Sequence, residues 1–250
     1  MNSYDREQVL THWENNKVES MYDKHLIQAE IDLILSRLQE GSKVLDAGCG
    51  EGEGTLAYSK IPNIRIHAAD FSETRLSKAK ERLNDVENVY FKKVDFVGDY
   101  QLDNDYDFVV CQRFLINITD WEIQKKILLN LMGNLKKGSK LIMLEGYLQG
   151  TNTLNQLRSL WGLKPIPIQW HNLFFDDTEL IPFMEKEGFS IVEEDGLGAY
   201  FLLTRGIRPS LQEELNWDCL FNKISSSSEV KKMLGNSVKF SRLKLWVFQK

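Results

Sequence analysis

Between residues 43 and 146, short apolar runs alternate with helical patterns, and this alternation constrains the fold more than any other feature. The apolar runs predict five strands: "KVLDAG", "IRIHAAD", "VYFKKVDF", "YDFVVCQ" and "KLIMLEGY". The segments between them include "GTLAYSK", "SETRLSKAKERL" and "TDWEIQKKILLNLMGNL", which have helical spacing. Strands joined by helical crossovers form a largely parallel sheet with helices on both faces. We therefore predict an α/β fold, Rossmann-like and doubly wound, with about seven mostly parallel strands and helical insertions.

The chain on either side of this core completes a single domain, residues 1–250. Residues 1–40 predict an N-terminal helical cover, because the apolar residues of "HLIQAEIDLILSRL" recur at helical spacing before Gly41. After the core, "AYFLLTR" predicts a further strand, "PSLQEELNWDCLFNKI" a helix and "RLKLWVFQK" the closing strand. We interpret residues 151–175 and 206–236 as insertions that form a substrate lid.

The stretch "VLDAGCGEGEGT" places four glycines within seven residues, directly after a predicted strand and beside Asp46. Glycine allows a ligand to approach the backbone closely and tolerates positive φ. The helix that follows offers unpaired N–H groups. A strand, a glycine turn and a helix therefore predict a site for a polar ligand at the carboxyl edge of the sheet.

The acids in this stretch separate two classes of cofactor. A dinucleotide fingerprint, G-x-G-x-x-G, would place its third glycine at position 53, where the chain has Glu53. A pyrophosphate would also be repelled by Asp46, Glu51 and Glu53. S-adenosylmethionine has no phosphate and carries a cationic sulfonium and ammonium, so the nearby carboxylates favour it.

Five segments in order resemble the motifs of the class I S-adenosylmethionine-dependent methyltransferases. "VLDAGCGEG" is similar to their first motif, and the ends of the next four predicted strands resemble the following ones, over about residues 40–146. The resemblance implies a methyltransferase with S-adenosylmethionine as cofactor and S-adenosylhomocysteine as product. By position, Asp70 would hold the ribose hydroxyls and Asp95 would meet the adenine amine.

The residues that the resemblance implies for cofactor binding are Asp46, Ala47, Gly48, Gly50, Gly52, Asp70, Phe71, Asp95, Phe96 and Gln112. Structural alternatives stay open for several of them. Asp70 could cap a helix, Asp95 could be a turn acid, and Phe71 and Phe96 could be core residues. Cys49 is interpreted as a packing residue.

Methyl transfer to a hydroxyl needs a base to take the proton. Our candidates for catalytic residues are His171 as general base, Arg113 as an anion anchor and Glu145 as a second base or a hydroxyl ligand. The candidates for substrate binding are Asn117, Arg158, Trp170 and Asn172. A structural role is the alternative for each, and Trp13 and Tyr22 are expected to close the pocket from the N-terminal helices.

These groups favour a small polar, possibly anionic acceptor, such as a sugar or a phosphorylated intermediate, methylated at oxygen. No paired-acid metal site is evident, so we expect no metal. The alternatives are a non-catalytic methyltransferase-like binding protein, a nicotinamide-dependent oxidoreductase, and a nucleic-acid methyltransferase acting through the basic segment.

The composition limits the kinds of partner and the cellular compartment that we expect for the protein. Net charge is −5, which disfavours nucleic acid, although residues 200–250 hold nine Lys or Arg and four Asp or Glu, a balance of +5. The three cysteines fit no disulfide or zinc spacing. The start "MNSYDREQVL" is polar and no apolar run suits a membrane helix, so we expect a cytoplasmic protein with no membrane partner. The sequence does not indicate an oligomeric state.

Overall fold

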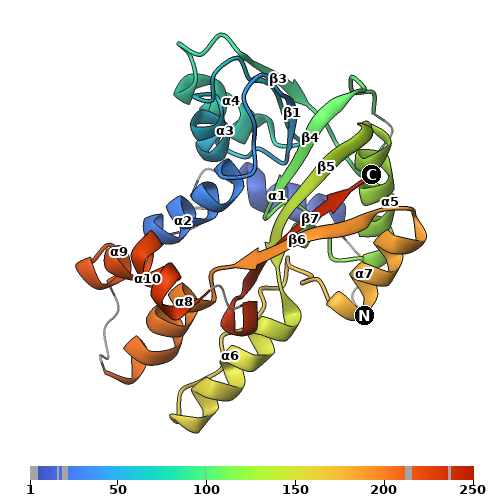
Figure 1. Ribbon diagram of the computed structural model, residues 1–250. Coiled ribbons are helices and arrows are strands. Elements are labelled where there is room, and N and C mark those ends of the chain that lie inside the picture. The colour runs from blue at the N-terminus through green and yellow to red at the C-terminus, as the bar shows by residue number, and fades with distance from the viewer. Residues whose placement is uncertain (1–4, 16, 19–21, 99, 212–215, 236–237) are drawn as a thin grey trace.

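The computed structural model describes residues 5–15, 17–18, 22–98, 100–211, 216–235 and 238–250. Its centre is a seven-stranded sheet with the order β3-β2-β1-β4-β5-β7-β6 (Figure 1). The strands are β1 Lys43–Ala47, β2 Arg65–Asp70, β3 Val89–Lys93, β4 Tyr106–Gln112, β5 Leu135–Gly146, β6 Ser190–Gly196 and β7 Leu243–Gln249. The first five pair in parallel, and β7 runs antiparallel to both β5 and β6. This confirms the predicted doubly wound, mostly parallel sheet.

Helices connect the strands and cover both faces of the sheet (Figure 1). The helices are α1 Arg6–Glu14, α2 Lys24–Leu35, α3 Glu53–Tyr58, α4 Glu73–Arg82, α5 Trp121–Gly133, α6 Leu148–Leu160, α7 Asp177–Lys186, α8 Gly198–Phe201, α9 Leu220–Ser225 and α10 Ser228–Leu234. Short 3₁₀ turns lie at η1 Leu115–Asn117, η3 Arg208–Ser210 and η4 Val238–Phe240, and a π-helical segment, η2, spans Leu202–Ile207. Ser72 and Asp120 cap α4 and α5, because their side chains accept backbone N–H groups of the first turn.

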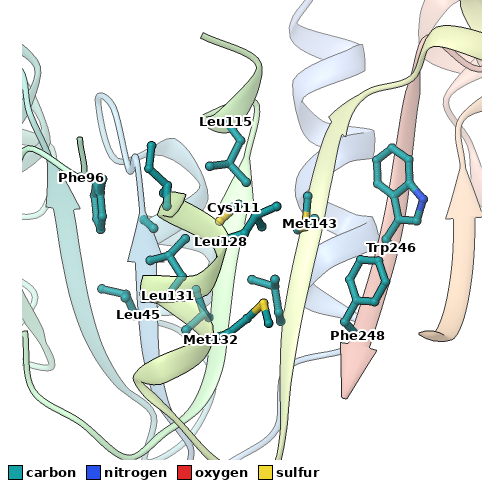
Figure 2. Packing of buried hydrophobic residues seen from close by; sticks show 14 of the residues in the cluster. Leu45, Phe96, Cys111, Leu115, Leu128, Leu131, Met132, Met143, Trp246 and Phe248 are labelled. Atoms are coloured by element: carbon teal, nitrogen blue, oxygen red, sulfur yellow. The ribbon is translucent and has the colours of Figure 1, made fainter. Parts of the chain in front are cut away.

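Two apolar clusters, one on each face, hold the sheet between the helices. On one face, Leu128, Leu131 and Met132 of α5 pack toward the strands that contribute Cys111 and Met143 (Figure 2). Leu26, Ile31 and Ile34 of α2 belong to the cluster on the other face. The central strands β1, β4, β5 and β7 are therefore buried from both sides, which is why they are mostly apolar, whereas the edge strands β3 and β6 are partly exposed.

Two expectations about the last third of the chain were wrong. The run "AYFLLTR" is helical: α8 continues into η2, and the buried Tyr200, Phe201 and Thr204 share one helical face. A short apolar run fits either structure by periodicity alone. The helix expected over residues 209–224 begins only at Leu220, although residues 212–215 lie outside the described part of the chain.

Candidate functional site

The glycine stretch forms a tight turn between β1 and α3. Gly48 and Gly50 both have positive φ, at 74° and 55°. A Cβ at Gly48 would lie 2.5 Å from the Phe114 side chain, so only glycine lets that ring pack on the turn. A Cβ at Gly50 would meet no atom within 4 Å, and Gly50 lines a cavity at the carboxyl edge of the sheet.

Asp46 and Asp70 end neighbouring strands beside this turn, and both line the cavity. The Asp70 carboxylate accepts the N–H groups of Gly50 and Ser72, each at 2.9 Å. The Thr55 hydroxyl donates to Asp46 at 2.6 Å. Burial raises the pKa of Asp46 to about 6, with Asp70 adding to the rise, and burial also raises the pKa of Asp70.

The turn after β3 brings two predicted residues to the same cavity. Asp95 accepts the N–H of Val97 at 3.0 Å and forms an ion pair with Arg6. The Phe96 ring is buried and lies 5.0 Å from the ring of Phe114. Phe96 is thus both a core residue and a wall of the cavity, so the two interpretations of this side chain are compatible.

The turn after β4 is fixed by a buried acid that the sequence analysis did not identify. Glu30 of α2 accepts the Gln112 side-chain amide at 2.9 Å, and its Oε2 lies 3.1 Å from Nε of Arg113. Burial raises the pKa of Glu30. Arg113, at φ 49°, therefore lines the cavity with its charge already paired. Glu30 interrupts the apolar face that includes Ile27 and Ile34, and this was the signal available in the sequence.

Glu145 does not line the cavity. Its side chain is 0% exposed and accepts the N–H groups of Phe114, Leu115 and Ile116 at 2.9–3.2 Å. The carboxylate thereby holds the loop after β4, and it reaches no acceptor, which corrects the catalytic role we expected for it. Burial raises the pKa of Glu145 to about 8, against the lowering effect of these hydrogen bonds.

The loop between α6 and α7 brings His171 and Asn172 into the cavity wall. His171 Nδ1 and Asn172 Oδ1 are buried and have no hydrogen-bond partner among the described residues. The His171 ring stacks on His12 of α1, with centroids 4.6 Å apart, and Trp13 lies edge-on at 5.5 Å. Burial, and then His12, lower the pKa of His171 to about 4, so the imidazole is neutral near pH 7.

The remaining predicted residues divide by position. Asn117 and Phe71 line the cavity, whereas Ala47 and Gly52 lie in the turn without lining it. Trp170 is 54% exposed and does not line the cavity, and its ring lies edge-on to the rings of His12 and His171. Arg158 lies outside the cavity and donates to the carbonyl of Lys164 at 2.9 Å. Trp13 does line the cavity, whereas Tyr22 does not and is exposed.

The charges around the cavity fit a cationic cofactor. Five carboxylates line it, those of Asp46, Glu51, Glu53, Asp70 and Asp95. Its two arginines are both paired with acids, Arg75 with Glu51 at 2.7 Å and Arg113 with Glu30. A pyrophosphate would meet net negative charge, whereas the sulfonium and ammonium of S-adenosylmethionine are attracted. The Asp70 carboxylate accepts two N–H groups and keeps further lone pairs that can accept hydroxyl groups of a ligand.

Two findings apply to the described ranges of the chain. No helix there combines the length and the apolarity that crossing a bilayer requires. No group of three or more His, Cys, Asp or Glu side chains there could hold a metal ion.

Comparison with known proteins identifies the kind of domain. Residues 38–174 match the family model described as a methyltransferase domain. Demethylmenaquinone methyltransferase of Staphylococcus carnosus (strain TM300) is 27% identical over 184 residues, which cover 73% of this chain and 75% of that protein. The corresponding enzyme of Staphylococcus haemolyticus (strain JCSC1435) is 26% identical over 200 residues, which cover 79% and 78%.

Solved structures share the fold across the full chain. The N-methyltransferase NodS of Bradyrhizobium japonicum, in complex with S-adenosyl-L-homocysteine, superposes with a TM-score of 0.60 at 14% identity and covers 98% of this chain and 97% of its own. A chain in the complex of the Haloferax volcanii Trm112 methyltransferase activator with a putative methyltransferase gives a TM-score of 0.65 at 17% identity, with 97% of both chains covered.

Proposed function

The chain belongs to the S-adenosylmethionine-dependent class I methyltransferases, and we propose that it methylates a hydroxyl of a small polar acceptor, with His171 as the general base. S-adenosylmethionine is the cofactor, and it supplies an electrophilic methyl group on a sulfonium. We assign its binding to the turn around Gly48 and Gly50, to Asp70 for the ribose, and to Phe71, Asp95 and Phe96 around the adenine.

One observation carries the choice of acceptor. His171 Nδ1 and Asn172 Oδ1 are buried polar atoms without a partner among the described residues, and both residues line the cavity that holds the glycine turn. A buried polar group left unpaired is costly, so a polar acceptor that hydrogen-bonds to both would be favoured. Neutral His171 can take the hydroxyl proton, and the Asn172 amide can orient a second polar group of the acceptor.

The walls also support exclusion of water from the reaction. Trp13 of α1 forms part of the cavity wall, and His171, from the loop between α6 and α7, lies beside it in the same wall. We propose that residues 151–175 act as the wall that selects the acceptor, while residues 1–40 cover the cofactor. Positioning of this kind can contribute about 7–11 kcal/mol to lowering the barrier.

A lipophilic acceptor is the second candidate. The two Staphylococcus relatives are demethylmenaquinone methyltransferases, and the cavity has apolar walls at Trp13, Phe114 and Ile116. Such an acceptor offers fewer polar groups to the unpaired atoms of His171 and Asn172 than a sugar does, and for this reason we place it second.

His171→Ala tests the proposal against both alternatives. Radiolabelled methyl transfer is measured on a panel of hexoses, hexose phosphates and a demethylmenaquinone, and S-adenosylhomocysteine binding by calorimetry. We expect turnover on a hydroxylated acceptor to fall by about 10²–10⁴-fold with cofactor affinity nearly unchanged.

The matched control is His25→Ala, since His25 pairs with Asp218 and lies outside the cavity wall. Full activity of His171→Ala would show that His171 is not the general base. Activity confined to the demethylmenaquinone would establish the second candidate. Failure of the folded wild type to bind S-adenosylhomocysteine would overturn the function as a whole.

A further inference from the structure

Three arginines gather outside the cofactor cavity, next to the loop that carries His171. This arginine cluster comprises Arg158 near the end of α6, Arg205 in η2 and Arg242 directly before β7. Arg158 Nη1 donates to the carbonyl of Arg205. Arg242 precedes Leu243, which pairs with Gly146, so the cluster lies at the carboxyl end of β5. That is the edge of the sheet where the cavity opens.

The cluster carries positive charge that the described part of the chain does not neutralise. Arg205 pairs with Asp23, whose carboxylate also accepts the Tyr200 hydroxyl at 2.8 Å. Arg158 and Arg242 form no ion pair with any described residue. Their hydrogen bonds go to backbone carbonyls, which have no formal charge.

These carbonyls belong to the loop between α6 and α7, the same loop that carries His171. Arg242 donates to the carbonyls of Ile166 and Pro167, at 3.2 and 3.1 Å, and Arg158 donates to that of Lys164 at 2.9 Å. The Arg242 guanidinium also lies 5.6 Å from the centroid of the Phe174 ring. The cluster therefore contacts the loop on both sides of His171 in sequence.

Each guanidinium keeps donors for a ligand. Arg158 Nη2 and Arg242 Nε bond to no described residue, and neither is among the buried unpaired atoms, so both face solvent. Burial, and then Arg205 and Arg158, lower the pKa of Arg242 to about 10. Burial and then Arg205 lower that of Arg158. Like charges held together in this way favour a bound anion.

We propose that the arginine cluster binds a phosphoryl group of the methyl acceptor. This inference rests on the proposed function, and it names the acceptor as a phosphorylated molecule. The planar donors of arginine match phosphate oxygens in pairs. An anion held at the cluster would anchor the acceptor on the loop that also carries His171 and Asn172, with its hydroxyl free to enter the cavity.

The test measures binding of pyrophosphate and glucose 1-phosphate by calorimetry at constant ionic strength, with the full chain saturated in S-adenosylhomocysteine. Arg242→Gln removes one charge, and Arg242→Lys keeps the charge but loses the paired donors. The control is Arg65→Gln, because Arg65 is exposed at the start of β2. Flotation with phosphatidylglycerol vesicles separates a lipid-borne phosphate from that of a free metabolite.

We expect saturable phosphate binding that Arg242→Gln weakens by about tenfold or more, Arg242→Lys weakens less, and Arg65→Gln leaves unchanged. S-adenosylhomocysteine affinity should stay the same in all variants that fold. If Arg242→Gln does not fold, the same comparison is made with Arg242→Lys. If wild type binds S-adenosylhomocysteine but neither the phosphate probes nor the vesicles, the result overturns this inference and leaves the proposed function intact. So does binding that the Arg242 variants leave unchanged. Loss of S-adenosylhomocysteine binding in wild type would instead overturn the proposed function.

Discussion

At the scale of single residues, Asp70 links the glycine turn to the second strand. Its two carboxylate oxygens accept N–H groups from Gly50 and from Ser72, so the acid fixes the turn and faces the cavity at once. Removing the carboxylate should therefore affect the ligand more than the fold, because the sheet around β2 is held by its own ladder.

Asp70→Asn is expected to weaken S-adenosylhomocysteine binding by about 1–3 kcal/mol, the usual contribution of hydrogen bonds to a charged group. Titration calorimetry measures the change, and Asp85→Asn, at an exposed position after α4, is the matched control. Equal affinities for the two variants would remove Asp70 from the ribose site.

Sequence motifs located the polar residues that touch the cavity from strand ends, such as Asp46, Asp70 and Asp95. They could not show what long side chains bond to. Glu145 is the last residue but one of β5, yet its carboxylate accepts three N–H groups of a neighbouring loop. The sequence predicted that Arg113 would be available for an anion, but its guanidinium pairs with Glu30. That partner lies more than eighty residues earlier in the chain, so no local motif indicates the pair.

At the scale of elements, several side chains hold α1 over the cavity, and Glu14 is one of them. Glu14, at the end of α1, accepts the N–H groups of Glu73 and Thr74 at 2.8 and 3.2 Å, in the first turn of α4. The Arg75 guanidinium lies 4.9 Å from the centroid of the Trp13 ring. Trp13 and Val9 of α1 both line the cavity, and we therefore expect a bound cofactor to leave faster when the contacts that hold α1 are weakened.

Glu14→Gln is expected to accelerate S-adenosylhomocysteine dissociation about two- to fivefold, because a charged contact with a helix N-terminus contributes roughly 0.3–1 kcal/mol. Stopped-flow tryptophan fluorescence measures the rate. Glu7→Gln, exposed on the same helix, keeps the net charge equal to that of the first variant. Identical rates in both variants would mean that α1 does not control release.

Helices and strands of residues 43–146 were predictable because their apolar periods differ clearly and their caps are local. The segment from Ala199 to Arg205 was not, since seven mostly apolar residues fit a buried strand or a buried helix equally. Packing decided for the helix: α8 and η2 bury Tyr200 and Thr204 on one face, with the Tyr200 hydroxyl on Asp23 of the N-terminal cover.

At the scale of the whole molecule, the sheet buries acids at the edge where the cavity lies. Burial raises the pKa of Asp46 to about 6 and that of Glu145 to about 8, and it also raises the pKa of Glu30. A carboxyl whose pKa is higher in the folded state binds a proton that the unfolded chain releases. Stability is then lost as pH rises from the unfolded value, near 4.5, to the folded one.

Histidines act in the opposite direction at lower pH. The pKa of His171 falls to about 4 on burial, so its contribution to stability is gained as pH rises from about 4 to about 6.5 and is constant above that. Between pH 6.5 and 8 the remaining change comes from buried carboxyls with a raised pKa, Glu145 and Glu30 among them. We expect the free energy of unfolding to fall there by up to about 1.4 kcal/mol per pH unit, the slope for one proton.

Glu145→Gln should reduce the slope of the unfolding free energy between pH 6.5 and 8, because an amide does not titrate. The variant should also be less stable overall, because the amide makes poorer contacts with the N–H groups of Phe114, Leu115 and Ile116. Urea unfolding at constant ionic strength from pH 6 to 9 measures both proteins, with the exposed Glu81→Gln as the control that keeps the wild-type slope. A wild type whose stability stays constant from pH 6.5 to 8 would show that the three N–H groups outweigh burial and keep Glu145 ionised. In that case the loop beside the cavity is held by a full negative charge, and the same carboxylate would add to the field that attracts the cationic cofactor.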